Sequence, residues 1–249
     1  MKRLFTILYQ KWPEYLIEIL VIIIGILAAF TLNNWNDVRN TRKQENVLLS
    51  NFLEDVKLDS HALNSYQNRI ATQSILNQKL FLVSKGNKPI HEIENLNIIR
   101  WNMNIGHIAY SNNPEIATNL SSETIRKAIR EYYSRITLHD FIVKEYNHVI
   151  IDIVRPFLRS KKILETDGIF ARSTFDTIDH ELFIFQDSQK ISNSPTIDQE
   201  KFSMIASSEE FEQVLFEISA KTGVLEREYV SLKAANQELI AIIKEFLNQ

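Results

Sequence analysis

The chain contains no cysteine among its 249 residues. This absence excludes disulfides, thiolate metal sites and cysteine nucleophiles together, and it leaves the redox compartment open. Glycine and proline are scarce as well, at five residues each. Because they fall at separated points rather than in repeated turns, the composition favours a helical protein.

A concentration of positive charge is also missing. The formal net charge is -3, and the basic residues are scattered along the chain, so we expect no nucleic-acid partner. Glycine-rich phosphate loops, Gly-x-Ser-x-Gly and His-Glu-x-x-His motifs are all absent from the sequence. The sequence therefore predicts a protein that is not an enzyme and binds no cofactor.

One long apolar run is present, over residues 16–32. It is apolar on every face, as a helix in lipid is, and neither strand alternation nor an amphipathic stripe explains it. Trp12 and Tyr15 precede the run and Trp35 follows it, where interfacial aromatic rings belong. We predict one membrane-spanning helix with its interfacial cap over residues 13–36, so that the lipid bilayer is a partner.

The anchor divides the chain into three parts. Residues 1–12 form a basic, amphipathic segment, Pro13 suits the first position of the spanning helix, and residues 37–249 form an extramembrane helical domain. A cleaved signal peptide is the alternative, but no small-x-small cleavage site follows the run. Basic residues flank the span on both sides, so the charge rule only weakly favours a cytoplasmic N-terminus and a periplasmic domain in the bacterial inner membrane. A cytoplasmic domain remains the other orientation.

Three residues inside the span are candidate contacts with a membrane partner. Glu18 is a carboxylate within the apolar run, although it lies close enough to the helix start to reach the headgroups instead. Gly25 and Ala29 form a small-x-x-x-small pair of the kind found where membrane helices approach closely.

The span closes with Asn33, Asn34, Trp35 and Asn36, whose amides and indole suit the headgroup region. With residues 24–28 and the basic residues that follow, this closing motif resembles the N-terminal anchor of domain-of-unknown-function family 6090, a family of bacterial membrane-anchored helical proteins. Residues 110–133 are similar to the middle segment of that family, except that Ser111-Asn112 stands where relatives carry Ser-Gly. The resemblance implies location and architecture, and no activity.

A long helix is expected after the anchor, because residues 26–85 contain neither glycine nor proline. An apolar stripe runs along it at three-to-four spacing, with Asp59 assigned to the polar side. Gly86 and Pro89 predict its end. The stripe consists of Leu48, Phe52, Val56, Leu63, Tyr66, Ile70, Leu76, Leu80 and Val83.

The last helix has the clearest periodicity. Its apolar residues step by three and four from Phe211 to Phe246, which is coiled-coil spacing. Ser207 with Glu210 predicts a capping box at its start. Asn236 falls on the seam, where a buried polar residue fixes register, and Gly223 falls off it. The seam pairs either with the long first helix, antiparallel to it, or with another protomer.

The middle of the chain is less regular. We predict a short helix over residues 91–103 with Trp101 packed in the core, caps at Ser121 or Ser122 and at Asp198, and a kink or restart at Pro156. These middle helices are expected to form a head far from the membrane. Residues 169–185 fit either a helix or a strand.

Histidines offer few candidates for chemistry. Glu145 and His148 have the Glu-x-x-His spacing of di-iron bundles, but the second motif that such sites need is absent. His139-Asp140 and Asp179-His180-Glu181 are adjacent in sequence and point apart on a helix. The aromatic residues 132–133 and 183–185 fit a core better than a ligand groove.

The sequence thus predicts an all-α protein: one N-terminal transmembrane helix followed by an elongated helical bundle with long antiparallel first and last helices. The leading functional hypothesis is a scaffold that binds another envelope protein or a second copy of itself. The alternative is a ligand-binding sensory or accessory subunit of a membrane complex.

Overall fold

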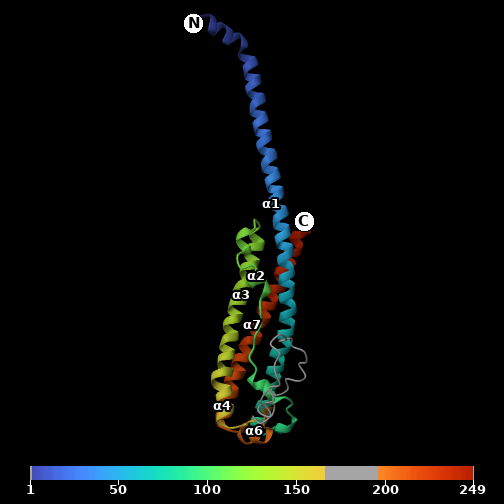
Figure 1. Cartoon of the computed structure of the whole chain (residues 1–249), viewed down its shortest axis with the longest axis vertical. Helices are drawn as coiled ribbons and strands as arrows, with labels where there is room; N and C mark the ends of the chain where they lie inside the picture. The colour runs from blue at the N-terminus through green and yellow to red at the C-terminus, as the bar shows by residue number, and fades with distance from the viewer. Residues whose placement is uncertain (1, 166–195, 249) are drawn as a thin grey trace, which may run out of the picture.

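The computed structural model describes residues 2–165 and 196–248, and these are almost entirely helical. The first element is one unbroken helix, α1 (Lys2–Ser84), of 83 residues. We expected the spanning helix to begin at Pro13, but α1 begins earlier and includes Pro13 as an interior residue. An interior proline removes one backbone hydrogen bond and bends a helix, and Figure 1 shows that α1 bends near its N-terminus.

The first part of α1 stands clear of the rest of the molecule (Figure 1). Within the described residues, Ile17–Ser84 is the one helix long and apolar enough to cross a membrane, with a most apolar window of mean hydropathy 2.1 that is 0% buried. Phe30 and Trp35, for example, are 72% and 62% exposed. The structure therefore agrees with the prediction of a helix able to span a membrane.

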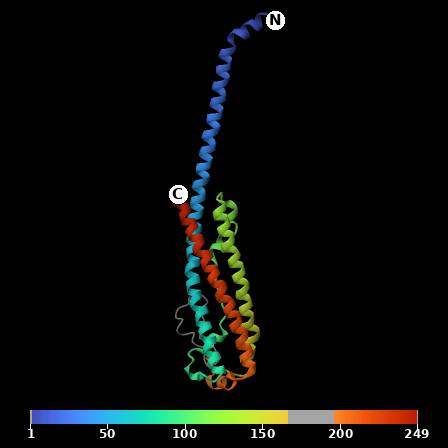
Figure 2. The same cartoon turned by 180° about the vertical axis from the view of Figure 1, so that it is seen from behind.

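Three long helices form the bundle. The last, α7 (Glu209–Leu247), packs against both α1 and α3 (Glu123–His148). It runs antiparallel to α1, so that the C-terminus lies beside α1 at the end of the bundle nearer the anchor, here called the anchor end (Figures 1 and 2). Ten of the eleven residues predicted on the seam of α7 are buried, and the eleventh, Phe246, is partly buried. The ten buried residues are Phe211, Leu215, Ile218, Thr222, Leu225, Tyr229, Leu232, Asn236, Leu239 and Ile243. The predicted antiparallel pairing of the first and last helices is confirmed.

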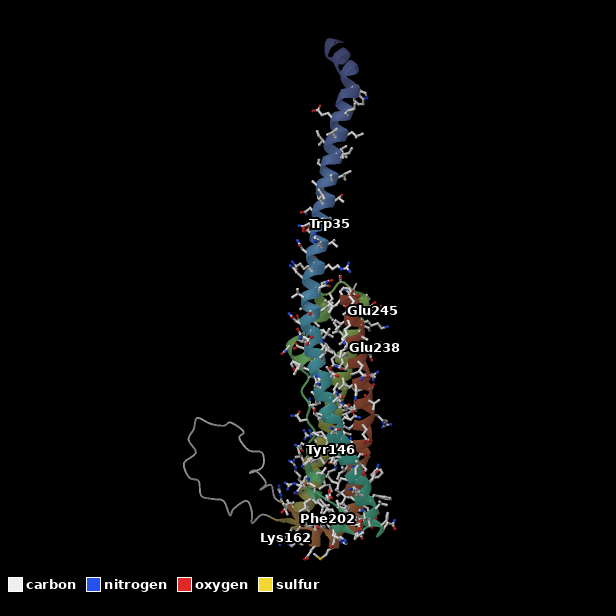
Figure 3. The ribbon with its side chains drawn as sticks, turned by 90° about the vertical axis from the view of Figure 1, so that its right-hand side faces the viewer. Trp35, Tyr146, Lys162, Phe202, Glu238 and Glu245 are labelled. Carbon is white, nitrogen blue, oxygen red and sulfur yellow. The ribbon has the colours of Figure 1, made fainter. Side chains whose placement is uncertain are left out.

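The opposite, distal end consists of short elements. They are η1 (Ile90–Glu92), η2 (Leu96–Arg100), α4 (Arg155–Ser160), α6 (Gln199–Ala206) and the two-residue strands β1 (Leu164–Glu165) and β2 (Thr196–Ile197), which pair antiparallel. Lys162 and Phe202 mark this end in Figure 3, and Trp35 lies on the free part of α1. The predicted helix over residues 91–103 is therefore wrong, because two 3-10 turns stand in its place, and Trp101 is 37% exposed rather than packed in the core.

The chain then returns to the anchor end through α2 (Ile108–Asn112) and η3 (Ile116–Asn119). Because of this return, α3 starts at the anchor end and spans the bundle, so the expectation that the middle helices form a distal head is wrong for α3. A π-helical segment, η4 (Val149–Val154), follows α3, and Pro156 lies in the first turn of α4. The predicted restart at Pro156 is confirmed.

Local signals end and begin the helices. Gly86 has φ +72° at the end of α1, and the amides of Gly86 and Asn87 donate to the carbonyls of Val83 and Leu82, which is a Schellman motif. Ser122 and Asp198 cap α3 and α6 as predicted. Ser208, and not Ser207, caps α7, because Ser207 ends α6. Residues 169–185 lie outside the described residues.

Candidate functional site: the groove between α1 and α7

A groove of about 920 Å³ lies between the distal half of α1 and the first half of α7. Its position follows from antiparallel packing, since residues near the end of α1 face residues near the start of α7. We call it the α1–α7 groove. It is lined by Ser74, Asn77, Gln78, Phe81, Leu82 and Ser84 of α1 and by Glu212, Gln213, Leu215, Phe216, Ser219, Thr222, Gly223 and Glu226 of α7.

The α7 wall of the groove is a second helical stripe. Phe216, Ser219, Gly223 and Glu226 step by three and four, so they share one face of the helix. This stripe is displaced by one residue from the buried seam, and it therefore lies at the solvent side of the α1–α7 contact.

The floor of the groove is polar, and a chain of hydrogen bonds crosses it from α1 to α7. Gln73 Nε2 donates to Asn77 Oδ1 at 3.0 Å, and Asn77 Nδ2 donates to Thr222 Oγ1 at 3.1 Å. The Thr222 hydroxyl donates in turn to the Ile218 carbonyl at 2.8 Å. Buried amides bonded in this way hold the two helices at one register.

The rims of the groove are aromatic and its charges are acidic. Phe81 and Phe216 are 55% and 66% exposed, one on each helix. Lys85 Nζ lies 2.6 Å from Glu212 Oε1 and so neutralises that carboxylate at the distal end. Within the described part of the chain, the half-buried Glu226 makes no hydrogen bond or ion pair, so the groove carries one uncompensated negative charge.

Gly223 leaves the middle of the groove open. It lies inside a 39-residue helix, and a Cβ added to it would meet no atom within 4 Å. Alanine would favour the helix by about 1 kcal/mol over glycine. Packing within the single chain therefore does not require glycine at position 223. Close approach of another molecule to the backbone would require it.

A separate polar network is buried between α1, α2, α3 and α7. Asp59 is 0% exposed, which overturns its assignment to the polar side of α1. Its carboxylate accepts from the amides of Ile108 and Ala109 at 2.6 and 3.3 Å, and from the Tyr132 hydroxyl at 2.8 Å. Burial raises the pKa of Asp59, and these donors oppose the shift. The network fastens α2 to α1.

Asn236 belongs to the same network. Its side-chain amide is 0% exposed and donates to the Val56 carbonyl at 3.0 Å and to the Tyr132 hydroxyl at 3.2 Å. Tyr132 is likewise 0% exposed, and burial raises the pKa of its hydroxyl. The position of Asn236 fits the hypothesis that it sets register, which stays a prediction.

Two histidines lie beside this network. His139 is 0% exposed with both ring nitrogens unpaired, and its ring centroid is 5.3 Å from that of Tyr66 and 6.3 Å from that of His107. Burial, with the nearby His107, lowers the pKa of His139 to about 4. His107 Nε2 lies 3.4 Å from Asp140 Oδ1. His139 is therefore a core side chain that is neutral near pH 7, because its buried environment disfavours the protonated form.

Further carboxylates of α1 hold the returning chain. Glu45 accepts from the Ser121 amide and hydroxyl at 2.6 and 2.8 Å. Asp55 accepts from the Asn112 and Asn113 side chains at 3.2 and 2.8 Å. Together with Asp59, they fasten α2 and the start of α3 to α1, beside the ring contacts of Phe52 with Tyr133 and of Tyr66 with His139.

The predicted anchor residues lie on the free part of α1. Glu18, Gly25, Ala29, Asn34 and Asn36 are exposed and touch no other element. Asn33 Nδ2 donates to Asp37 Oδ2 at 3.2 Å. The Arg39 guanidinium lies 5.7 Å from the centroid of the Trp35 ring. None of these residues lines the α1–α7 groove, so the structure does not join the predicted anchor residues to the groove.

The other candidates have ordinary partners. Glu145 pairs with Lys221 at 3.1 Å and His148 with Asp152 at 2.6 Å. In residues 2–165 and 196–248, no group of three His, Asp or Glu side chains is arranged to hold a metal ion. Tyr132 is buried and Tyr133 is partly buried in the core, and Asp179, His180 and residues 183–185 lie outside the described residues.

Comparisons with known proteins add no relative. No family model, no curated protein and no solved structure matches the chain. The resemblance of the anchor to family 6090 stays a prediction.

Proposed function

We propose that the chain is a single-pass protein of the bacterial inner membrane whose bundle stands in the periplasm and binds another protein of the envelope. The α1–α7 groove carries this proposal. It is lined by two exposed phenylalanines and by an open glycine, features that the packing of one chain does not require. Exposed aromatic side chains beside a concave surface are typical of protein-binding sites.

The continuity of α1 supports an arrangement in which the bundle is held at a set distance from the bilayer. Among the side chains of α1 that the structure describes, at position 12 and at positions 17–84, the first buried one is Glu45. From Trp35 at the interface to Glu45 the helix rises about 15 Å. The groove begins further along, at Ser74, about 60 Å of helix beyond Trp35, so it lies well away from the headgroups, where a partner protein has access to it.

Site-specific photocross-linking in native membranes tests the binding of a partner. Benzoylphenylalanine replaces Phe216 or, as the control, Phe141 of α3, which is also an exposed phenylalanine at 59% and does not line the groove. We expect cross-linked protein from position 216 and little from position 141. Equal yields at the two positions, or none at either, would contradict the proposal.

The orientation has its own test, because the chain has no cysteine to remove. The variant Met204→Cys places a single thiol on α6 at a position that is 76% exposed. A membrane-impermeant maleimide should label it in spheroplasts if the bundle is periplasmic. Labelling only after the cells are broken would place the bundle in the cytoplasm.

The ligand-binding alternative predicts a different observation. A small molecule bound in the groove would raise the melting temperature of the protein, and groove substitutions would abolish that shift without any cross-linked protein.

A further inference from the structure

We infer that the occupant of the α1–α7 groove is a single amphipathic α-helix of a partner protein, with a bulky apolar residue between Phe81 and Phe216 and a lysine or arginine opposite Glu226. This inference rests on the proposed function and specifies the chemistry of the partner.

The shape of the groove favours a helix. Its walls are two antiparallel helices, and on α7 the small residues Ser219 and Gly223 lie between Phe216 and Glu226. A helix that lies along two others needs small residues on one side of the contact for their backbones to approach closely. Gly223, which costs its own helix stability and has open space above its Cα, meets that need.

The aromatic end of the groove specifies an apolar anchor. Phe81 and Phe216 project from opposite walls, and both are more than half exposed. A leucine, methionine or aromatic side chain seated between them would remove apolar surface of all three residues from water, which is the main source of affinity in such contacts.

At the end of the groove that carries Glu226, charge specifies the chemistry of the partner. Glu212 is paired with Lys85, and Glu226, the second acidic residue of the lining, makes no ion pair within the described residues. A half-buried carboxylate that a partner covers needs a cation, since desolvation without pairing is unfavourable. A basic residue on the occupant supplies it.

The spacing along α7 gives the register of the partner. From Phe216 to Gly223 the helix rises about 10 Å, and from Phe216 to Glu226 about 15 Å. A partner helix that lies parallel or antiparallel to α7 therefore carries its basic residue about ten or eleven positions from its apolar anchor, with a small residue between them.

The experiment measures cross-linking of the full-length protein in native membranes, with benzoylphenylalanine at position 216 and groove variants in the same chain. Gly223→Leu should lower the yield by about tenfold or more, because its side chain fills the floor. The control Ala220→Leu places the same side chain on an exposed position of the same helix and should leave the yield unchanged. Since a Cβ at position 223 meets no neighbour, both variants should fold, as circular dichroism checks.

Charge is tested in the same way. Glu226→Lys should lower the yield by about fivefold or more through repulsion of the partner cation, while Glu238→Lys, an exposed position further along α7 (Figure 3), should not. Mass spectrometry of the cross-linked peptide should identify a segment with apolar residues at helical spacing and a basic residue ten or eleven positions from the cross-linked one.

The outcomes separate the two proposals. If position 216 cross-links to no protein, the proposed function itself fails. If it cross-links to a partner, but the yield is insensitive to Gly223→Leu and Glu226→Lys, or the peptide is non-helical in pattern or lacks the basic residue, the proposed function stands and this inference is overturned. A cross-link within the same chain or to a second copy overturns it as well.

Discussion

At the scale of single residues, the buried polar side chains of α1 follow the same spacing as its apolar ones. Asp59 lies three residues after Val56 and four before Leu63, and Gln73 and Asn77 continue the pattern. All three are buried. Periodicity alone thus indicates that position 59 is buried, whereas the charge of an aspartate side chain favoured an exposed position. The deciding factor was a set of donors from α2 and α3, which are distant in sequence.

Asp59→Asn should destabilise the protein by about 2 kcal/mol. The amide that replaces the carboxylate has one acceptor oxygen, so it cannot serve the Ile108 amide, the Ala109 amide and the Tyr132 hydroxyl together. Urea unfolding followed by circular dichroism measures the change. Glu54→Gln, at an exposed residue paired only with Lys57, should change stability little, and equal effects of the two variants would contradict the role of Asp59.

His139 should make the stability of the fold depend on pH below neutrality. Its folded pKa of about 4 lies below the ordinary value of 6.5, so the unfolded chain binds the proton first. The stabilising contribution of the neutral His139 to the free energy of unfolding is therefore complete above pH 6.5. It is lost as the pH falls toward 4, and the loss reaches up to about 3 kcal/mol.

The variant His139→Phe isolates this effect, because neither ring nitrogen has a hydrogen-bond partner to lose and the edge contact with Tyr66 is retained. We expect the difference in unfolding free energy between wild type and variant to grow in favour of the variant between pH 6.5 and 4. The raised pKa of Asp59 acts in both proteins and cancels. A constant difference over this range would show that His139 is not buried in its neutral form.

At the scale of elements, α7 carries two stripes with different purposes. The buried seam binds α1 and α3, and the neighbouring stripe of Phe216, Ser219, Gly223 and Glu226 lines the groove. The sequence contained both, at the same three-and-four spacing. Only the pairing of α7 with the distal half of α1 brought Phe216 and Phe81 to opposite walls of one groove.

Gly223→Ala should stabilise the isolated chain by up to about 1 kcal/mol. The new methyl group meets no neighbour within 4 Å and shields the backbone of α7. Thermal unfolding in detergent measures the effect. The matched control Ala220→Gly, three residues away at an exposed position, should lower the stability by a similar amount. If Gly223→Ala destabilised the protein instead, the space around position 223 would be tighter than the groove geometry requires.

The structure of the connection over residues 101–122 was the hardest to predict from the sequence. It contains one short helix and one 3-10 turn, and it is held by contacts from other helices rather than by its own propensity. Asn147, for example, bonds both the amide and the carbonyl of Met103, at 2.8 and 2.7 Å. Such side-chain bonds depend on the final packing, and no local pattern predicts them.

At the scale of the whole molecule, the anchor and the bundle share one helix, and every side chain from 17 to 44 is exposed. Beyond position 17, burial on α1 begins at Glu45, and α7 ends beside α1 at the anchor end of the bundle (Figure 2). Glu245 of α7 marks this end of the bundle in Figure 3. The bundle therefore holds its complete core without the anchor.

Residues 40–249 alone should accordingly form a soluble, helical protein that unfolds cooperatively. Every residue of the core cluster lies after position 40, so removal of the anchor takes away no buried contact. Circular dichroism and thermal melting of this fragment, compared with the full chain in micelles, test the expectation. A fragment without a cooperative transition would mean that the free part of α1 stabilises the bundle.

Local sequence was enough to predict the apolar helix of the anchor, the long first and last helices, the end of the first helix at Gly86 and the caps at Ser122 and Asp198, because these depend on local periodicity and on single residues at helix ends. The tertiary structure decided which helix faces are buried and which remain exposed. It buried Asp59, His139 and Asn236 among partners far away in the chain, carried residues 101–122 back toward the anchor end, and set Phe81 and Phe216 across a common groove. These outcomes depend on tertiary packing, which joins residues from 49 positions apart, as at Asp59 and Ile108, to 180 positions apart, as at Val56 and Asn236, and no short window of sequence contains both partners.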